Sequence, residues 1–256
     1  MKTVQHFWKH LNLLNLMEPD NMNKYMIISG GRVDLQSLQG LMDRHMGCYD
    51  NCGNCNDRDD CDDCKIIAVD KGLEICNKIG LTPDVIVGDF DSASSAVVGM
   101  YRRIAKKKKS IEFLDLDTHK DFTDTHVALQ YALDHKASEI YISGATGTRM
   151  DHTMANIGLL KICADHNVKA YIEDDNNIIT MIKGSEKLSR IEGYDYVSLI
   201  PYGGAVADVT LTGFEYDVSN YTFEIGDSRG VSNSISEDEA SIEYESGYMI
   251  VVYSRD

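Results

Sequence analysis

The chain has 256 residues, of which 43% are hydrophobic and 26% charged, and its formal net charge at pH 7 is −16. This length suits one large domain or two modest ones. The negative charge argues against nucleic acid or an anionic membrane as a partner. No apolar run approaches the ~20 residues of a membrane span. A polyanionic ligand would therefore depend on locally placed cations, either bound metal or lysine and arginine side chains.

The first 23 residues are expected to be an extension, because the first convincing strand begins just after Met22. Its leucines are interrupted by Asn12, Asn15 and Glu18, so no signal peptide is predicted. The chain contains seven cysteines. Without a secretory signal they favour a reducing cytosol over disulfides, and a cytoplasmic location is expected.

Strand–turn–helix units follow one another through the first part of the chain. Strands are expected at 25–28, 66–69, 85–87, 111–114, 140–143 and 169–172, and the longer helices at 34–44, 101–109, 121–135 and 151–166. This alternation predicts a parallel sheet with helical crossovers. We assign it to an α/β domain over residues 24–175.

The pattern changes after about residue 176, where no helical period remains. Short alternating runs, separated by glycines, occur at 178–182, 196–200, 205–211, 221–225, 240–244 and 248–253. They predict an antiparallel, all-β sandwich or barrel over residues 176–256.

The most informative stretch is 83–92, in which the apolar run 85–87 is followed by Gly88, Asp89 and Asp91. Residues two apart in an extended segment point the same way. Two carboxylates held together repel unless a cation or proton lies between them, and oxygen ligands of this kind suit Mg²⁺. Taken alone, the same pair could simply cap the following helix.

Further acids follow other elements of the predicted sheet. Asp70 ends the second strand, and Asp121 and Asp124 are expected on one face at the start of a helix. Ligands of open α/β sheets collect beyond the carboxyl ends of the strands. The segment Thr118-x-x-Asp121 also resembles a capping box, which is the structural alternative for these acids.

A glycine-containing loop at 144–149 precedes the last predicted helix of the α/β part. Arg149 offers a planar fork for phosphate oxygens, and the helix start is an anion site. Asp151 and His152 could equally be a capping residue and a partly buried histidine. The Walker lysine motif and the serine-hydrolase elbow are both missing from the sequence.

These motifs, in this order, resemble the thiamine pyrophosphokinase family over roughly residues 24–253. The segments that carry the resemblance are Asp70-x-Gly72, 83–92, Lys120-Asp121-x-Thr123-Asp124, Gly147-x-Arg149-x-Asp151-His152-x-x-x-Asn156, Thr212-Gly213-Phe214-x-Tyr216 and Val231-Ser232-Asn233. The combination of Gly-Asp-Phe-Asp-Ser with Lys-Asp-x-Thr-Asp is far more specific than a single Asp-x-Asp.

The resemblance implies an ATP-dependent diphosphotransferase that moves a pyrophosphoryl group from ATP to the hydroxyl of thiamine, giving thiamine diphosphate and AMP. It implies a homodimer with active sites at the interface. The Mg²⁺-binding and catalytic residues would be Asp89, Asp91, Asp121 and Asp124. ATP would contact Asp70, Lys71, Gly72, Asp89, Lys120, Thr123, Gly147, Arg149 and Asp151. Thiamine would contact Tyr216, Ser232 and Asn233.

One position departs from the family pattern, since Lys71 stands where a glycine is usual. A side chain there would narrow or recharge the nucleotide pocket. Which residue takes the proton of the alcohol stays open.

The insertion at 48–64 contains Cys52-x-x-Cys55 and Cys61-x-x-Cys64. This paired spacing is typical of a four-thiolate structural Zn²⁺ site, although the five residues between the pairs are fewer than in a zinc ribbon. The alternative is a solvated acidic loop with unligated thiols.

Two other functions remain open at this point. A pyrophosphokinase of the same fold could act on another alcohol, such as a hydroxymethylpterin. A non-catalytic, metal-regulated nucleotide-binding protein would use the cysteine segment as a sensor.

Overall fold

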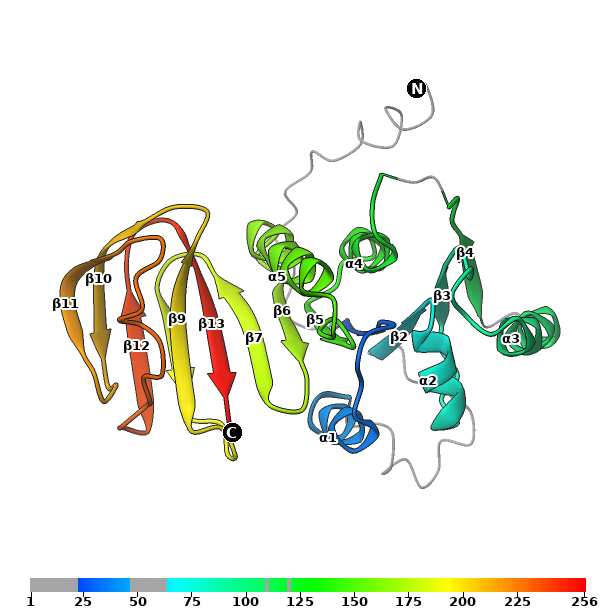
Figure 1. The fold of residues 1–256 in the computed structure, drawn as a ribbon, viewed down its shortest axis with the longest axis horizontal. Coiled ribbons are helices and arrows are strands. Elements are labelled where there is room, and N and C mark those ends of the chain that lie inside the picture. The colour runs from blue at the N-terminus through cyan, green and yellow to red at the C-terminus, as the bar shows by residue number, and fades with distance from the viewer. Residues whose placement is uncertain (1–22, 47–63, 109–110, 119–120) are drawn as a thin grey trace.

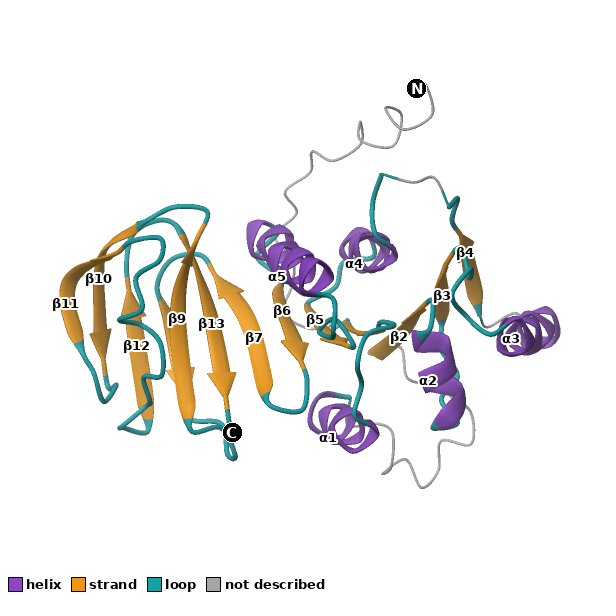
Figure 2. Ribbon diagram, viewed as in Figure 1, coloured by secondary structure: helices purple, strands orange, loops and turns teal. Residues whose placement is uncertain are grey.

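The computed structural model describes residues 23–46, 64–108, 111–118 and 121–256. Its strands form two sheets (Figures 1 and 2). The larger has the order β4-β3-β2-β1-β5-β6-β7-β13-β9, and the smaller has the order β11-β10-β12-β8.

The first eleven elements form the α/β part and confirm the predicted alternation. They are β1 (Lys24–Ile28), α1 (Leu35–His45), β2 (Cys64–Val69), α2 (Gly72–Lys78), β3 (Val85–Gly88), α3 (Ser95–Lys108), β4 (Glu112–Asp115), α4 (Asp124–Asp134), β5 (Glu139–Ser143), α5 (Met150–Asp165) and β6 (Lys169–Glu173). All pairs from β4 across to β6 are parallel.

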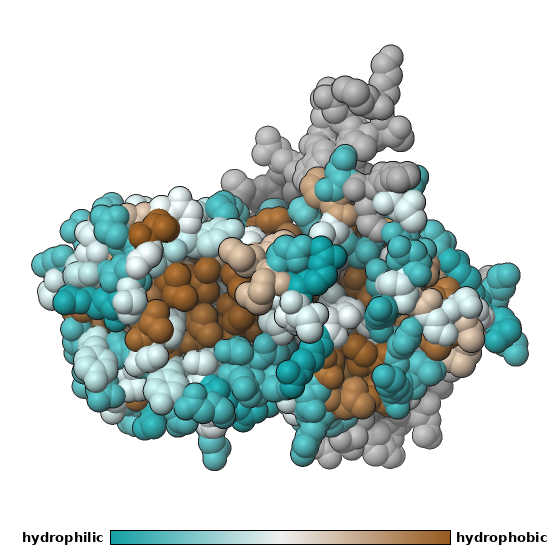
Figure 3. Space-filling view, viewed as in Figure 1, coloured by the Kyte–Doolittle hydropathy of each residue, from teal (hydrophilic) through white to brown (hydrophobic). Residues whose placement is uncertain are grey.

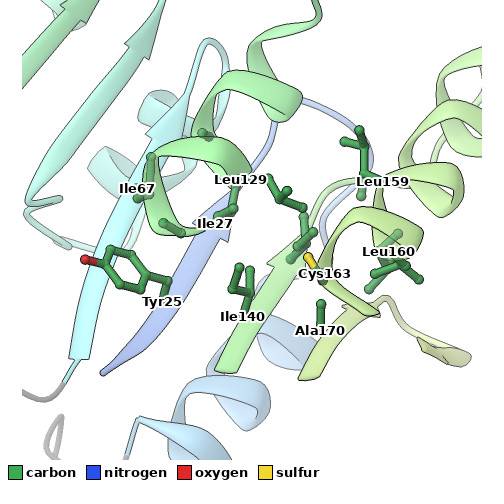
Figure 4. Close-up of a cluster of buried hydrophobic side chains, with 14 of the residues drawn as sticks. Tyr25, Ile27, Ile67, Leu129, Ile140, Leu159, Leu160, Cys163 and Ala170 are labelled. Carbon is green, nitrogen blue, oxygen red and sulfur yellow. The ribbon is translucent and has the colours of Figure 1, made fainter. Parts of the chain in front are cut away.

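Helices cover both faces of this parallel sheet because alternate strand residues point to opposite sides. Tyr25 and Ile27 of β1 belong to a buried cluster with Leu129 of α4 and Leu160 of α5 (Figure 4). The intervening Met26 packs in a second cluster with residues of α1 and α2. Continuous apolar runs such as 66–69 are therefore required, since both sides of the strand are buried.

The remaining strands form the predicted all-β sandwich. They are β7 (Asn177–Ile182), β8 (Glu186–Ser189), β9 (Tyr196–Tyr202), β10 (Val206–Thr212), β11 (Val218–Phe223), β12 (Glu239–Glu243) and β13 (Tyr248–Ser254). The antiparallel strands β7, β13 and β9 extend the large sheet. Their buried residues, such as Leu199 and Val251, form one core with Phe223 and Ile242 of the smaller sheet.

The large sheet continues through the region where we expected a domain boundary. β6 pairs with β7 across the turn at 174–176, with Tyr171 opposite Thr180. The α/β part and the sandwich therefore share one hydrogen-bonded sheet, which fixes their relative position.

One sequence expectation near the site is wrong. Helix α4 begins at Asp124 rather than Asp121, because Thr123 is extended and its side chain accepts a hydrogen bond from the N–H of His126 at 3.3 Å. Asp121 thus precedes the helix and does not share a helical face with Asp124.

Several expectations concern residues outside the described part of the chain. These are the N-terminal extension at 1–22, Lys120, and the cysteines Cys52, Cys55 and Cys61. Cys64, the last of the four predicted zinc ligands, is the first residue of β2 and is half-buried. Over the described ranges, none of the helices is both long and apolar enough to span a membrane.

Candidate active site

Three carboxylates meet beyond the carboxyl ends of β2 and β3. Asp70 directly follows β2, while Asp89 and Asp91 follow β3, and one oxygen from each lies within 4.8 Å of the others. The strands are neighbours, with Val69 opposite Val87, so their ends deliver these acids to the same point. We call Asp70, Asp89 and Asp91 the acidic cluster.

The backbone around the acidic cluster is held in unusual conformations. Asp70 has φ 47° and Phe90 has φ 60°, both in the left-handed region that residues with a side chain rarely adopt. Strained residues of this kind concentrate at functional sites. The N–H of Asp91 donates to Oδ1 of Asp89 at 3.2 Å, which orients one carboxylate of the cluster.

The electrostatics of the cluster favour a bound cation. Burial, followed by the neighbouring charge of Asp124, raises the pKa of Asp70 to about 6. Asp124 also lies within hydrogen-bonding reach of Asp70. Three carboxylate oxygens this close fit a hard divalent cation such as Mg²⁺, which would offset their mutual repulsion.

A cavity of about 600 Å³ adjoins the acidic cluster and shares Asp70 with it. Its walls come from the turns after β1, β2 and β5 and from the N-terminal ends of α4 and α5. The lining residues are Ser29, Gly30, Gly31, Arg32, Val69, Asp70, Lys71, Ser92, Thr123, Asp124, Thr125, Gly144, Ala145, Thr146, Gly147, Thr148, Arg149, His152, Thr153 and Asn156. The opening at a parallel-sheet edge is the usual place for a nucleotide.

Buried hydrogen bonds fix the walls of this cavity. The hydroxyls of Ser29 and Thr125 lie 2.9 Å apart and join the end of β1 to α4. Asn156 Nδ2 donates to the carbonyl of Ala145 at 2.7 Å and thereby ties α5 to the glycine-containing loop. A loop that is already fixed in this way can bind a ligand without the entropy cost of becoming ordered on binding.

Cationic side chains at the cavity can offset the charge of an anionic ligand. Lys71, the residue that departs from the family pattern, lines the cavity at the N-terminal end of α2. Arg149 lies just before α5 and is paired with Asp151 at 2.5 Å, with side chains 69% and 64% exposed. The guanidinium of Arg149 lowers the pKa of Asp151.

The structure brings together most, but not all, of the residues that the sequence singled out. Asp70, Lys71, Thr123, Asp124, Gly147 and Arg149 line the cavity. Gly72 instead serves close packing, because a Cβ there would lie 1.9 Å from the carbonyl oxygen of Ile28. Asp121 is exposed and stands outside the acidic cluster, whereas Asp70 belongs to it.

Sequence reasoning did not select Arg32, Ser29 or Thr125, all of which line the cavity. Ser29 and Arg32 flank the glycine turn that ends β1, so their position at the sheet edge was a usable signal. Thr125 could not be selected in this way, because its place in the site depends on the packing of α4 against the end of β1, where its hydroxyl meets that of Ser29.

Comparisons with known proteins identify the family. Residues 62–172 match the thiamin pyrophosphokinase catalytic domain and residues 185–249 match the thiamin pyrophosphokinase vitamin B1 binding domain. The chain is 32% identical over 191 residues to the thiamine pyrophosphokinase of Bacillus subtilis, covering 74% of this chain and 87% of that protein. The chain belongs to the thiamine pyrophosphokinase family.

Solved thiamine pyrophosphokinase structures have the same fold. That of Bacillus subtilis superposes with a TM-score of 0.76 at 28% identity, over 91% of this chain and all of the other. That of Geobacillus thermodenitrificans gives a TM-score of 0.72 at 26% identity, over 91% of this chain and 98% of the other. The family, the fold and the enzyme class expected from the sequence motifs are thus confirmed.

In the vitamin B1 binding segment, the three predicted thiamine residues form one local structure. Tyr216 is 62% exposed, whereas Asn233 is 1% exposed. The Asn233 side chain accepts from the N–H groups of Tyr216 and Ser234 and donates to the carbonyl of Tyr216. Ser232 is exposed and has φ 57°. Asn233 therefore holds the loop that presents Tyr216.

Proposed function

We propose that this chain transfers a pyrophosphoryl group from ATP to the hydroxyl of thiamine, with Mg²⁺ held by Asp70, Asp89 and Asp91. The observation that supports it most directly is the acidic cluster beside the cavity, in a chain that matches both segments of the family. Asp124, next to Asp70, would complete the charge of the metal site.

The chemistry requires positioning and charge neutralisation more than covalent participation by the protein. Mg²⁺ would neutralise the phosphate oxygens when bound. Arg149 and Lys71, which also line the cavity, would contact phosphate oxygens. The loop at 144–149 leads into α5, whose N-terminal N–H groups favour an anion. Attack falls on the β-phosphorus, so the β- and γ-phosphates would be held together as the transferred unit.

The thiamine contacts are proposed to come from a second copy of the chain. Asn233 bridges to Val197 in β9, and six strands lie between β9 and β3 in the large sheet. Seven inter-strand steps of ~4.8 Å each therefore separate these positions by about 34 Å within one chain. Figure 1 likewise shows β10 and β11 at one end of the long axis and β3 and β4 at the other. One subunit cannot bring Tyr216 to its own acidic cluster.

The surface of the sandwich supports a homodimer. Strand β9 forms an edge of the large sheet and exposes Tyr196 and Ile200, and Val231 is 48% exposed. Figure 3 shows hydrophobic residues gathered on the sandwich half and surrounded by hydrophilic ones. Exposed edge strands and apolar patches mark surfaces that associate.

A product assay tests the reaction. Incubated with thiamine, ATP and Mg²⁺, the protein should release AMP and thiamine diphosphate in equal amounts. Release of ADP would mean single-phosphate transfer, and absence of turnover would favour a nucleotide-binding protein. A hydroxymethylpterin offered as competitor should leave the rate unchanged.

Mixed dimers test the shared site. Asp91→Asn and Tyr216→Ala would each be inactive alone, because each damages both sites of its own homodimer. Mixing and re-equilibrating the two should restore about a quarter of wild-type activity, since half of the dimers then carry one intact site. No recovery despite subunit exchange would contradict sites shared between subunits.

A structural Zn²⁺ bound by Cys52, Cys55, Cys61 and Cys64 remains part of the proposal, as does a cytoplasmic location. Metal analysis of freshly purified, reduced protein should find one zinc per chain, and Cys64→Ser should lower it. If the purified protein contains no zinc and is still stably folded, the proposed zinc site is contradicted.

A further inference from the structure

We propose that Arg32 is a second phosphate-binding guanidinium, held by Asp175 until ATP displaces that carboxylate. This inference rests on the proposed function, because it assigns a residue to the same nucleotide site. The first support is position. Arg32 lines the 600 Å³ cavity, and it also lines an adjoining cavity of about 330 Å³ together with Thr146, Gly147 and Thr148.

The backbone at Arg32 is fixed against the loop that carries Arg149. The N–H of Arg32 donates to the carbonyl of Thr146 at 3.0 Å, and the N–H of Gly31 donates to that of Gly144 at 2.9 Å. A Cβ on Gly31 would lie 2.3 Å from the Gly144 oxygen, so only glycine allows this approach. The two arginines therefore emerge from two loops that are hydrogen-bonded to each other.

The side chain of Arg32 is available to a ligand. Its guanidinium contacts Asp175 Oδ2 at 3.2 Å, with the Arg32 side chain 79% exposed and Asp175 31% exposed. Ion pairs this exposed contribute only about 0–1 kcal/mol, because water and salt screen them. A phosphate group can therefore replace the carboxylate at little cost, and two of its oxygens can accept from the guanidinium at once.

Charge explains why another cation is needed. Asp70 and Asp124 also line the cavity, and the whole chain carries a net charge of −16. A triphosphate entering this acidic surface is repelled except where metal or basic side chains offset it. Within the described residues, the lysine and arginine side chains of the lining are those of Arg32, Lys71 and Arg149.

The competing interpretation is that Arg32 only anchors the turn after β6. Asp175 lies in that turn, and its carbonyl accepts two hydrogen bonds from Arg255. If anchoring were the role of Arg32, removing either member of the Arg32–Asp175 pair would have the same effect. A phosphate-binding role predicts opposite behaviour, because loss of Asp175 frees the guanidinium.

The experiment compares Arg32→Ala and Asp175→Asn in the full-length protein, with steady-state kinetics and calorimetric binding of Mg·ATP. Arg32→Ala should raise the KM for ATP about tenfold and leave that for thiamine within twofold. Asp175→Asn should leave the KM for ATP unchanged or lower it. Arg32→Lys, which keeps the charge but not the planar fork, should give a KM for ATP between those of the wild type and Arg32→Ala. Lys187→Ala, which removes another exposed cation paired with an acid, Glu239, is the control for net charge.

Two results overturn the inference. One is an affinity for Mg·ATP that changes less than twofold in Arg32→Ala. The other is an equal loss of Mg·ATP affinity in Arg32→Ala and in Asp175→Asn. Calorimetry keeps this test separate from turnover. Wild-type protein that binds Mg·ATP but releases no AMP would refute the proposed reaction, while the Arg32 comparison would still decide the nucleotide contact. Arg32→Gln, which keeps the stem, replaces the alanine variant if that variant is unstable.

Discussion

The backbone N–H of Phe90 donates a hydrogen bond to Oδ1 of Asp70 at 3.3 Å, joining the turn after β3 to the turn after β2. Both residues have positive φ. The orientation of the Asp70 carboxylate thus depends on the neighbouring strand as well as its own. The acidic cluster behaves as one unit, in which the turn after β3 positions an acid from the turn after β2.

Gly88 allows this contact, and replacing it should disrupt the metal site. A Cβ at this position would lie 2.4 Å from Asp70 Oδ1, so Gly88→Ala has to push the carboxylate away. We expect a loss of Mg²⁺ affinity of about tenfold or more, measured by the Mg²⁺ dependence of the rate. Gly99→Ala is the control, because nothing lies within 4 Å of its Cβ position. If the Mg²⁺ dependence of the rate is unchanged in Gly88→Ala, Asp70 does not take part in metal binding.

Asp89→Asn and Asp91→Asn should each lower kcat by at least about 100-fold, because the charge that balances the metal is lost. The fold should persist, and without Mg²⁺ the thermal stability should stay the same or rise, since clustered acids repel one another. Asp208→Asn, at an exposed position in β10, serves as the control. Near-normal rates in both cluster variants would refute the assignment.

Asn156→Ala tests whether the loop at 144–149 must be held in place. The variant leaves the buried carbonyl of Ala145 without its donor, which costs about 1–3 kcal/mol of unfolding free energy. We also expect the KM for ATP to rise several-fold. Thr180→Val removes a comparable buried hydrogen bond to Ala170, away from the cavity. It should lower stability and leave the KM unchanged, and equal kinetic effects would contradict a local role for Asn156.

His45 predicts a pH dependence of stability that is separate from catalysis. Burial, together with the nearby Arg44 charge, lowers the pKa of His45 to about 4 from an ordinary 6.5, and the ring stacks on Tyr141 at 4.0 Å. The unfolded chain therefore binds this proton more tightly than the folded chain. The free energy of unfolding should fall as the pH drops from 6.5 to 4 and should not change through this group above pH 7.

Solvent screening of the half-buried His45 ring limits this loss to about 1–2 kcal/mol. Urea unfolding at several pH values, for wild type and His45→Gln, measures it. The variant should show a shallower slope between pH 6.5 and 4. Equal slopes would show that His45 does not contribute to the acid sensitivity.

Local patterns in the sequence were sufficient for the framework of the fold. The apolar run 85–87, the break at Gly88 and the spacing of Asp89 and Asp91 predicted a strand that ends in a pair of acids, as observed. The helix expected at 34–44 is α1, and its first expected residue, Asp34, caps it by accepting a hydrogen bond from the N–H of Ser37. These features depend on neighbours in sequence, so the sequence contains the information directly.

Features that depend on distant contacts could not be predicted. Strand β8 was missed because only Leu188 of its four residues is buried, which leaves no alternating pattern. The continuity of the sheet from β6 to β7 depends on pairing across a turn. The burial of Asn233 and the hydrogen bonds of its side chain to the backbone of Tyr216 could not be foreseen either, and its contact with thiamine stays a prediction from the resemblance. A sequence motif does not distinguish a ligand contact from the residue that supports it.

The central claim is that Asp70, Asp89 and Asp91 together hold the catalytic divalent cation. Crystals grown with Mn²⁺ in place of Mg²⁺ and a non-hydrolysable ATP analogue would test it by anomalous scattering. We expect an anomalous peak at roughly 2.2 Å from a carboxylate oxygen of each of the three residues, shared with the analogue's phosphates. A metal bound only to other residues, such as Asp121, or phosphates bound with no metal at the cluster, would contradict the claim.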